Sequence, residues 1–209
     1  MGVGGKNGTV SALLKTPAVI PLISLEDFRS QVQRYLPVRV ILIPFYELWD
    51  DVVFYRRWDI HKTLTYDGPV GLSSIGPDDY VMSEAYFIDF LRFARECNYN
   101  FVVAWDEPTY VDMPTDESWR NTVHGVEQLR RIMKAGIPAI GLLNGCNADQ
   151  YDRCADLLVK MGVEAAAVHV SEYLKYRNDR LLMDLMWDAL KIATSKFRKV
   201  LIVGATDPY

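Results

Sequence analysis

Carboxylate and amide side chains follow directly after several apolar runs in this sequence. Asp106 comes after residues 101–105 (FVVAW), and Pro108 ends any strand there because proline cannot donate a ladder hydrogen bond. Asp67 and Asn144 follow the runs LTY and IPAIGLL. The carboxyl ends of parallel strands meet at one edge of a sheet or one mouth of a barrel, where α/β proteins bind ligands. This spacing predicts one polar site containing Asp67, Asp106 and Asn144, although aspartate is also a common turn residue.

The residue types at these positions suit a planar ligand with several hydrogen-bonding groups. A carboxylate accepts paired N–H groups and an amide both donates and accepts, which fits the edge of a purine-like base. Gly145 either adds exposed loop backbone to this site or serves only a tight turn. Ser171 follows a further expected strand. Flat apolar walls are expected from aromatic neighbours, namely Trp105, Tyr110, Phe45 and Tyr46.

No metal or cofactor is predicted. The histidines, His61, His124 and His169, are solitary, and no two of them have the spacing of metal ligands. The sequence lacks the Gly-x-Ser-x-Gly, P-loop and GxGxxG motifs, which excludes the common nucleophile and phosphate-binding signatures.

Strand-like and helix-like segments alternate along the chain, which is typical of a (β/α) barrel. Helices are expected at residues 25–35, 77–98, 115–135, 148–161 and 181–193. Seven strands are expected, at residues 18–23, 38–43, 63–66, 101–105, 137–143, 164–170 and 199–203. A closed barrel of this type has about eight strands. The pattern therefore predicts an α/β fold of the TIM type that is incomplete or open, or that a partner chain completes.

Composition indicates a single globular domain over residues 1–209, with a flexible N-terminal tail at about residues 1–12. The formal net charge of −4 argues against a strong non-specific nucleic-acid binder. The three cysteines are odd in number and have no close paired spacing, which fits a reducing compartment. No apolar run approaches the ~20 residues of a membrane span. We therefore expect a cytoplasmic protein without membrane association.

The segments around the expected site follow the order of motifs in one known enzyme family. TPAVIPLISLEDF is similar to a Thr-Pro-Ala-Phe-Met-Pro-Val segment, and LTYDGPVGLSS to a Thr-Asp-Ser-Gly-Gly-Phe-Gln loop. FVVAWDE is similar to a strand that carries a base-reading aspartate, and GLLNGCNADQYDRCADLL to a Gly-Ile-Val-Gln-Gly-Gly segment with its Asp-x-Arg helix. VLIVGATDPY is similar to a Met-Gly-Val-Gly-x-Pro strand. Over nearly its whole length, the chain resembles a shortened N-terminal barrel portion of the tRNA-guanine transglycosylases.

That resemblance implies exchange of guanine for a 7-deazaguanine through a covalent aspartyl–ribose intermediate. It places Asp67 on the catalytic aspartate, Asp106 on the base-reading aspartate and Asn144 on the base-contacting glutamine. It places Val170 and Ser171 near the family's glycine pair. The sequence departs from the family where GPVGL replaces Ser-Gly-Gly-Phe-Gln. It also shows no counterpart of the nucleophilic aspartate and the zinc ligands, which lie later in that family.

The leading hypothesis is a pentosyltransferase-like protein that binds a guanine or 7-deazaguanine base, or its nucleoside. Asp67 would act at the ribose as a general acid or base. Base exchange, alone or with a partner chain, belongs to the same hypothesis. Expected partners are tRNA or another nucleic acid, and a partner chain or a second copy. One alternative is a non-catalytic base-binding or assembly module. Another is an unrelated TIM-barrel lyase or hydrolase.

Overall fold

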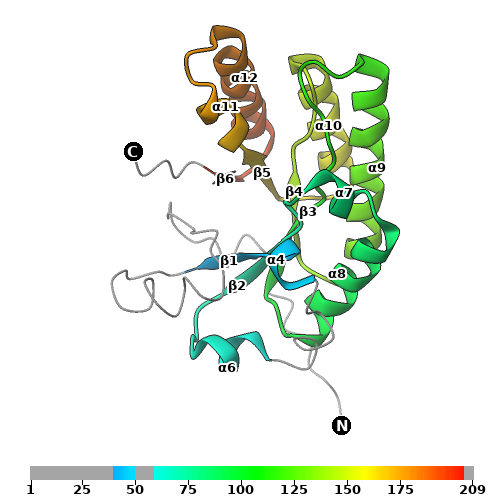
Figure 1. Cartoon of the computed structure of the whole chain (residues 1–209), viewed down its shortest axis with the longest axis vertical. Helices are drawn as coiled ribbons and strands as arrows, with labels where there is room; N and C mark the ends of the chain where they lie inside the picture. Colours follow the sequence, from blue (N-terminus) through cyan, green and yellow to red (C-terminus); the bar gives the residue numbers. More distant parts are fainter. Residues whose placement is uncertain (1–39, 50–58, 205–209) are drawn as a thin grey trace.

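The computed structural model describes residues 40–49 and 59–204. Within these ranges, parallel strands form one 6-stranded sheet in which the strand order follows the chain order. The sheet is curled and open, so it forms a half-barrel consistent with an incomplete TIM-like barrel (Figure 1). The described strands number six rather than the expected seven. They are β1 (Ile41–Pro44), β2 (Val70–Ser73), β3 (Phe101–Ala104), β4 (Ala139–Leu142), β5 (Ala165–His169) and β6 (Lys199–Val203).

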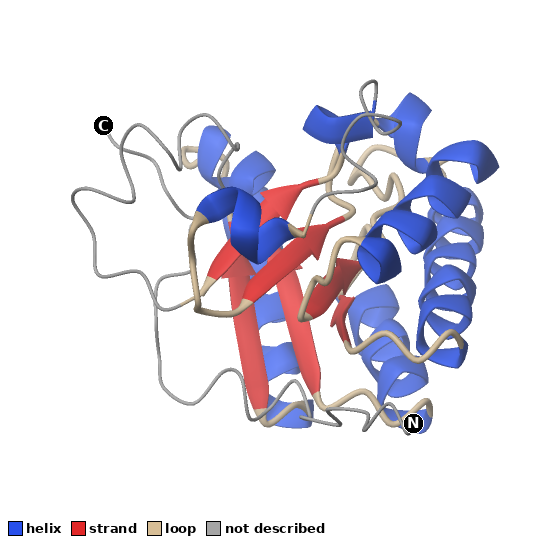
Figure 2. Ribbon diagram, turned by 90° about the horizontal axis from the view of Figure 1, so that it is seen from below, coloured by secondary structure: helices blue, strands red, loops and turns tan. Residues whose placement is uncertain are grey.

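Helices lie between consecutive strands, and the longest of them cover the outer face of the curled sheet (Figure 2). They are α4 (Tyr46–Trp49), α6 (Ile60–Leu64), α7 (Asp78–Val81), α8 (Glu84–Glu96), α9 (Thr115–Lys134), α10 (Ala148–Lys160), α11 (Ser171–Lys175) and α12 (Arg180–Lys196). Asn147 begins α10 because its side-chain oxygen accepts the backbone N–H of Gln150 at 3.0 Å. Asp179 caps α12 in the same way. Among the helices in the described ranges, none has the length and apolar character needed to cross a membrane.

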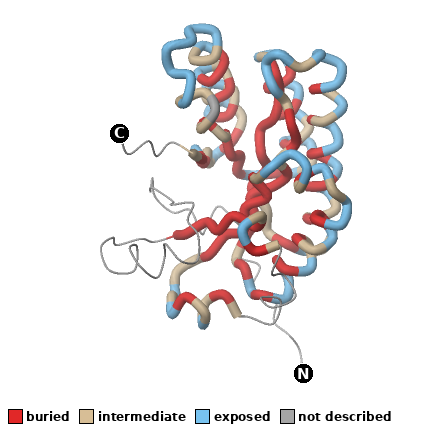
Figure 3. Tube along the Cα trace, in the orientation of Figure 1, coloured by how far each residue is buried: buried red, intermediate tan, exposed pale blue. Residues whose placement is uncertain are grey.

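Both faces of the sheet are buried. On β3, Val102 and Ala104 join the large apolar cluster beneath the helices, whereas Phe101 and Val103 join a smaller cluster on the inner face. Gly71 on β2 leaves room for this inner cluster, because a Cβ atom there would lie 2.4 Å from the Phe101 ring. Buried positions accordingly run through the centre of the sheet in Figure 3, as expected for unbroken apolar strands.

The strand expected at residues 63–66 is wrong. Residues Ile60–Leu64 form helix α6 instead, because the Asp59 side chain accepts two backbone N–H groups of its first turn, each at 3.1 Å. The strand of this region is β2, which begins only after Asp67.

The other expected elements differ mainly at their ends. The helix expected at residues 77–98 is divided into α7 and α8, because the Ser83 side chain accepts the backbone N–H of Tyr86 and starts a new helix. The short helix α11 was not expected. The strand at residues 18–23, the helix at residues 25–35 and the N-terminal tail lie outside the described residues.

Candidate functional site

The loops that follow β2, β3, β4 and β5 meet at the carboxyl end of the strands and enclose a cavity of about 650 Å³. Helices α10 and α11 and the first turn of α12 contribute further parts of its wall. This volume lies in the range of about 300–1,000 Å³ that is typical of pockets for small organic ligands. The polar and aromatic side chains that line it include Asp78, Asp106, Glu107, Tyr110, Asp112, Asn144, Tyr151, His169, Tyr173, Tyr176 and Asp179.

Asp106 is a half-buried carboxyl in the wall of this cavity. Its backbone N–H donates to Ser74 Oγ at 3.0 Å, and its carboxylate accepts the backbone N–H groups of Gly76 and Glu107. Burial raises the pKa of Asp106 to about 7; the nearby Asp78 and Glu107 carboxylates add to this rise, and the two backbone N–H groups oppose it. Asp106 therefore changes charge near neutral pH. When ionised, its carboxylate can only accept hydrogen bonds. When protonated, the carboxyl group can also donate one.

Asn144 lies beside Asp106 in the cavity wall. It follows β4 directly, and its Nδ2 donates to the backbone oxygen of Trp105 at 3.0 Å. This contact joins the ends of β3 and β4, so the amide is held next to the residue that precedes Asp106.

Glu107 is a nearly fully buried carboxyl that contacts helix α9. Its Oε1 lies 2.6 Å from Nδ1 of His124. Burial raises the pKa of Glu107, and the contact with His124 opposes this rise. Gly125 makes room for the arrangement, because a Cβ atom there would lie 3.1 Å from Glu107 Cγ and 3.2 Å from the Trp105 oxygen.

Imidazole and phenol groups form another part of the wall. His169 ends β5, and its Nε2 lies 2.6 Å from Ser171 Oγ. The hydroxyls of Tyr151 and Tyr173 form a close hydrogen bond. Burial raises the pKa of both tyrosines, so these phenols stay uncharged at neutral pH.

The structure does not bring Asp67 to this cavity. Asp67 lies in the loop that leads into β2, at the amino end of the sheet, and is exposed. The cavity lies at the opposite, carboxyl end of the strands. The expectation that Asp67 shares one site with Asp106 and Asn144 is therefore wrong, because the apolar run before Asp67 belongs to a helix and its turn.

Three other expected site residues do not line the cavity themselves. Gly145 packs against α10, where a Cβ atom would lie 2.9 Å from Cβ of Gln150, so its glycine serves this close approach. Val170 is buried in the cluster beneath the helices. Ser171 contacts the cavity-lining His169.

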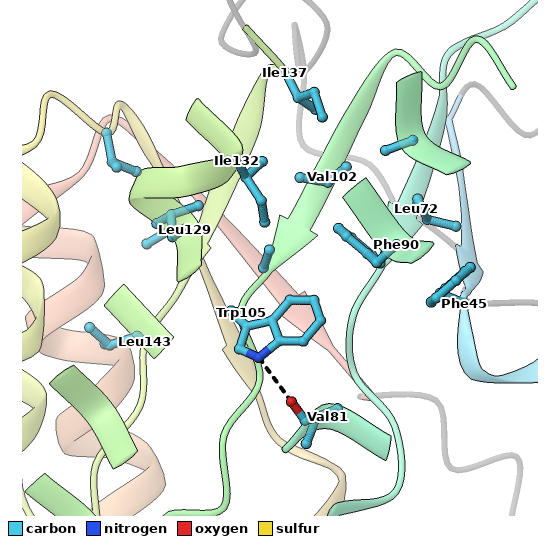
Figure 4. Close-up of a cluster of buried hydrophobic side chains, with 14 of the residues drawn as sticks. Phe45, Leu72, Val81, Phe90, Val102, Trp105, Leu129, Ile132, Ile137 and Leu143 are labelled. Atoms are coloured by element: carbon cyan, nitrogen blue, oxygen red, sulfur yellow. Dashed lines mark hydrogen bonds between the residues drawn. The ribbon is translucent and has the colours of Figure 1, made fainter. Parts of the chain in front are cut away.

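Two of the aromatic residues expected in the walls belong to the core. Trp105 packs against the Phe87 ring at a centroid distance of 5.1 Å, and its Nε1 donates to the backbone oxygen of Val81 at 3.2 Å (Figure 4). Phe45 lies in the same cluster. Tyr110 does line the cavity, as expected.

Sequence reasoning missed Glu107, His169, Tyr151 and Tyr173 as site residues. The signal for His169 was available in the sequence. Strand alternation places it on the inner face of the sheet, together with Ala165 and Ala167. The two tyrosines come from different helices, and no local pattern indicates that they meet.

The part of the chain that the structure describes contains no group of three or more His, Cys, Asp or Glu side chains placed to hold a metal ion. Cys97, Cys146 and Cys154 are buried. Burial raises the pKa of the Cys154 thiol to about 12, so it is not a reactive thiolate. The groups that the site offers to a ligand are thus carboxyl, amide, imidazole and phenol.

Fold and site together define an α/β half-barrel with an acidic, ligand-sized cavity at the carboxyl end of its strands. No family model matches the chain. No curated protein matches it significantly either.

Proposed function

We propose that the cavity binds a guanine or 7-deazaguanine base, or its nucleoside, and that Asp106 reads the edge of the base. The observation that carries this proposal is the half-buried Asp106 carboxyl in the cavity wall. When ionised, this carboxyl accepts two N–H groups from such an edge, and the Asn144 amide beside it can both donate and accept. The resemblance to the tRNA-guanine transglycosylases implies the same roles for these two positions.

The charge of the cavity favours a neutral ligand that is rich in N–H donors. Among the described residues that line it are several carboxyls but no lysine or arginine. A phosphate group inside would face these carboxylates without a compensating cation. A base or nucleoside therefore fits better than a nucleotide.

The size and the aromatic lining fit the same class of ligand. The rings of Tyr110, Tyr173 and Tyr176 offer flat apolar area with a polar end, which suits stacking against a base. The cavity volume of about 650 Å³ equals that of about 20 water molecules. Room for a ribose therefore remains beside a bound base. The His169 side chain offers the ribose hydroxyls a hydrogen-bonding partner.

Isothermal titration calorimetry with guanosine and 7-deazaguanosine at pH 8 tests the proposal. Asp106→Asn should weaken binding at least about tenfold, because each charge-assisted hydrogen bond contributes about 1.5–3 kcal/mol and the amide places a donor against a donor. Asp67→Asn is the matched control, since Asp67 lies at the opposite end of the sheet, and should leave the affinity unchanged. Equal binding by the Asp106→Asn variant, or no nucleoside binding by the unmutated protein, would refute the proposal.

Whether binding is accompanied by chemistry is a separate question that base exchange on RNA answers. A base-exchange enzyme incorporates labelled guanine into RNA, alone or with a partner chain. A non-catalytic base-binding or assembly module binds the nucleoside and incorporates nothing. Since Asp67 is remote from the cavity, we assign it no step.

A second candidate function is a TIM-barrel lyase or hydrolase in which Asp106 is the general acid or base. The observation that favours it is the pKa of Asp106, which burial raises to about 7, near the optimum for proton transfer at neutral pH. Such an enzyme is expected to hold a metal at its carboxylates. Stoichiometric metal in the purified protein, together with no nucleoside binding, would favour this second function.

A further inference from the structure

A chain of hydrogen bonds connects the buried Glu107 to the protein surface along α9. Glu107 Oε1 lies 2.6 Å from His124 Nδ1, and His124 Nε2 lies 3.2 Å from Gln128 Nε2. Gln128 Oε1 accepts a hydrogen bond from Arg131 at 2.7 Å. Arg131 in turn pairs with Glu84 at 2.7 Å. The cavity wall is thus connected to exposed charges through a single imidazole ring.

This chain determines which nitrogen of His124 carries the hydrogen. Arg131 can only donate, so it faces the amide oxygen of Gln128, and the amide nitrogen of Gln128 is left to donate to His124 Nε2. A neutral imidazole whose Nε2 accepts carries its hydrogen on Nδ1. His124 Nδ1 therefore donates to Glu107 Oε1, and this carboxyl oxygen is an acceptor.

The two partners differ strongly in exposure. The Glu107 side chain is 2% exposed, whereas the His124 side chain is 53% exposed. A buried carboxylate without a hydrogen-bonding partner is strongly disfavoured. Two side chains favour the ionised form of Glu107, His124 more strongly than the buried Trp105. Of these two, only His124 is exposed enough to be replaced without disturbing the core.

We infer that His124 is a positioning residue that holds Glu107 as an anion, and that this charge adds to the preference of the adjacent Asp106 for its protonated form. Asp106 and Glu107 are consecutive, and the Glu107 carboxylate is one of the charges that raise the pKa of Asp106. An anionic Glu107 thus keeps Asp106 protonated up to a higher pH. Any effect of His124 on base binding rests on the proposed function, because only ionised Asp106 accepts two N–H groups. The effect of His124 on the protonation of Asp106 does not depend on a ligand.

Other titratable groups face the two carboxyls from the surrounding elements. Asp78 on α7 raises the pKa of both carboxyls, and Tyr86 on α8 is close enough to interact with Asp106. Glu84 on α8 interacts with His124. The remaining groups lie around the cavity: Tyr110, Asp112, Tyr151, His169, Tyr173, Tyr176 and Asp179. All of these stay in place when only Glu107 or His124 is replaced, so a change in Asp106 reports on that pair.

The test is a carbon-13 NMR titration of the full chain labelled at aspartate Cγ, without ligand. The Asp106 signal is the one that Asp106→Asn removes, and its midpoint in the unmutated protein should lie near 7, as burial requires. Glu107→Gln should lower this midpoint, because a like charge is removed. His124→Phe keeps an aromatic ring but removes this donor, which disfavours the Glu107 anion, so the midpoint should fall as well. His124→Asn places an amide N–H near the position of Nδ1 and should keep the original midpoint.

Two results would overturn the inference. One is an Asp106 midpoint that Glu107→Gln leaves unchanged; the other is an equal effect of His124→Phe and His124→Asn. If Glu107→Gln fails to fold, the two variants of the exposed His124 still decide the question. Failure of the unmutated protein to bind a nucleoside would refute the proposed function alone, since the midpoint is measured without ligand.

Discussion

Replacing Asp106 by asparagine should stabilise the protein above neutral pH. In the folded protein burial raises the pKa of Asp106 to about 7, whereas its ordinary value is 3.8. Between these two values the folded state holds a proton that the unfolded chain has released, so the free energy of unfolding falls as pH rises through this window. Below pH 3.8 both states are protonated and the difference vanishes. Above pH 7 the loss is complete.

The size of this loss follows from the shift. The difference between about 7 and 3.8 is about 3 pH units, and each unit corresponds to about 1.36 kcal/mol, which gives an upper limit of about 4 kcal/mol. Solvent reaches the half-buried side chain and reduces the value. Asparagine has nearly the same shape, and its oxygen can still accept the N–H groups of Gly76 and Glu107. We therefore expect Asp106→Asn to gain about 1–4 kcal/mol at pH 8 and almost nothing at pH 4.

Urea unfolding at a series of pH values between 4 and 8, followed by tryptophan fluorescence, measures this difference. Asp67→Asn, which changes an exposed aspartate, should run parallel to the unmutated protein over the whole range. If the Asp106→Asn curve also runs parallel, the carboxyl is not desolvated in the folded protein and the reasoning about its pKa is refuted.

Two further changes test the packing around the site. Gly125→Ala should lower the free energy of unfolding by about 1–3 kcal/mol, because the new Cβ crowds Glu107 Cγ at 3.1 Å. Helix propensity alone would stabilise the variant by about 1 kcal/mol. A higher free energy of unfolding in urea would contradict this prediction. Gln150→Leu should cost about 2–4 kcal/mol in thermal unfolding, because Ser118 Oγ and the backbone N–H of Cys146 both lose a buried acceptor. A loss below about 1 kcal/mol would mean that water replaces these contacts.

The half-barrel could be predicted from the sequence because its strands are short apolar runs between amphipathic helices. Residues 101–105 and 164–170 read as buried strands and are buried strands, β3 and β5. Residues 63–66 were wrongly predicted as a strand because the segment is short and shows no clear period. The residue that starts helix α6 there is the N-cap Asp59, which lies before the segment. The glycine-containing strand β2 lacks the unbroken apolar character that the prediction relied on.

The candidate site was less predictable, because its parts meet only in the folded chain. Asp106 and Asn144 stood out because each follows a strand, and both line the cavity. Glu107 was missed, because its partner His124 lies on α9 and no spacing rule relates the two. The short helix α11, which brings Tyr173 to the cavity, has too few residues to show a helical period.

The strand order also bears on how the molecule folds. Each described strand pairs only with its neighbours along the chain, so successive units can join the sheet as they leave the ribosome, with little loop-closure entropy to overcome. The cavity, however, draws on residues from Gly76 to Leu182. Its wall is finished only when the first turn of α12 has docked. A nascent chain that has added β4 has thus formed much of its core but not yet its cavity. A ligand therefore cannot assist folding before the first turn of α12 has docked.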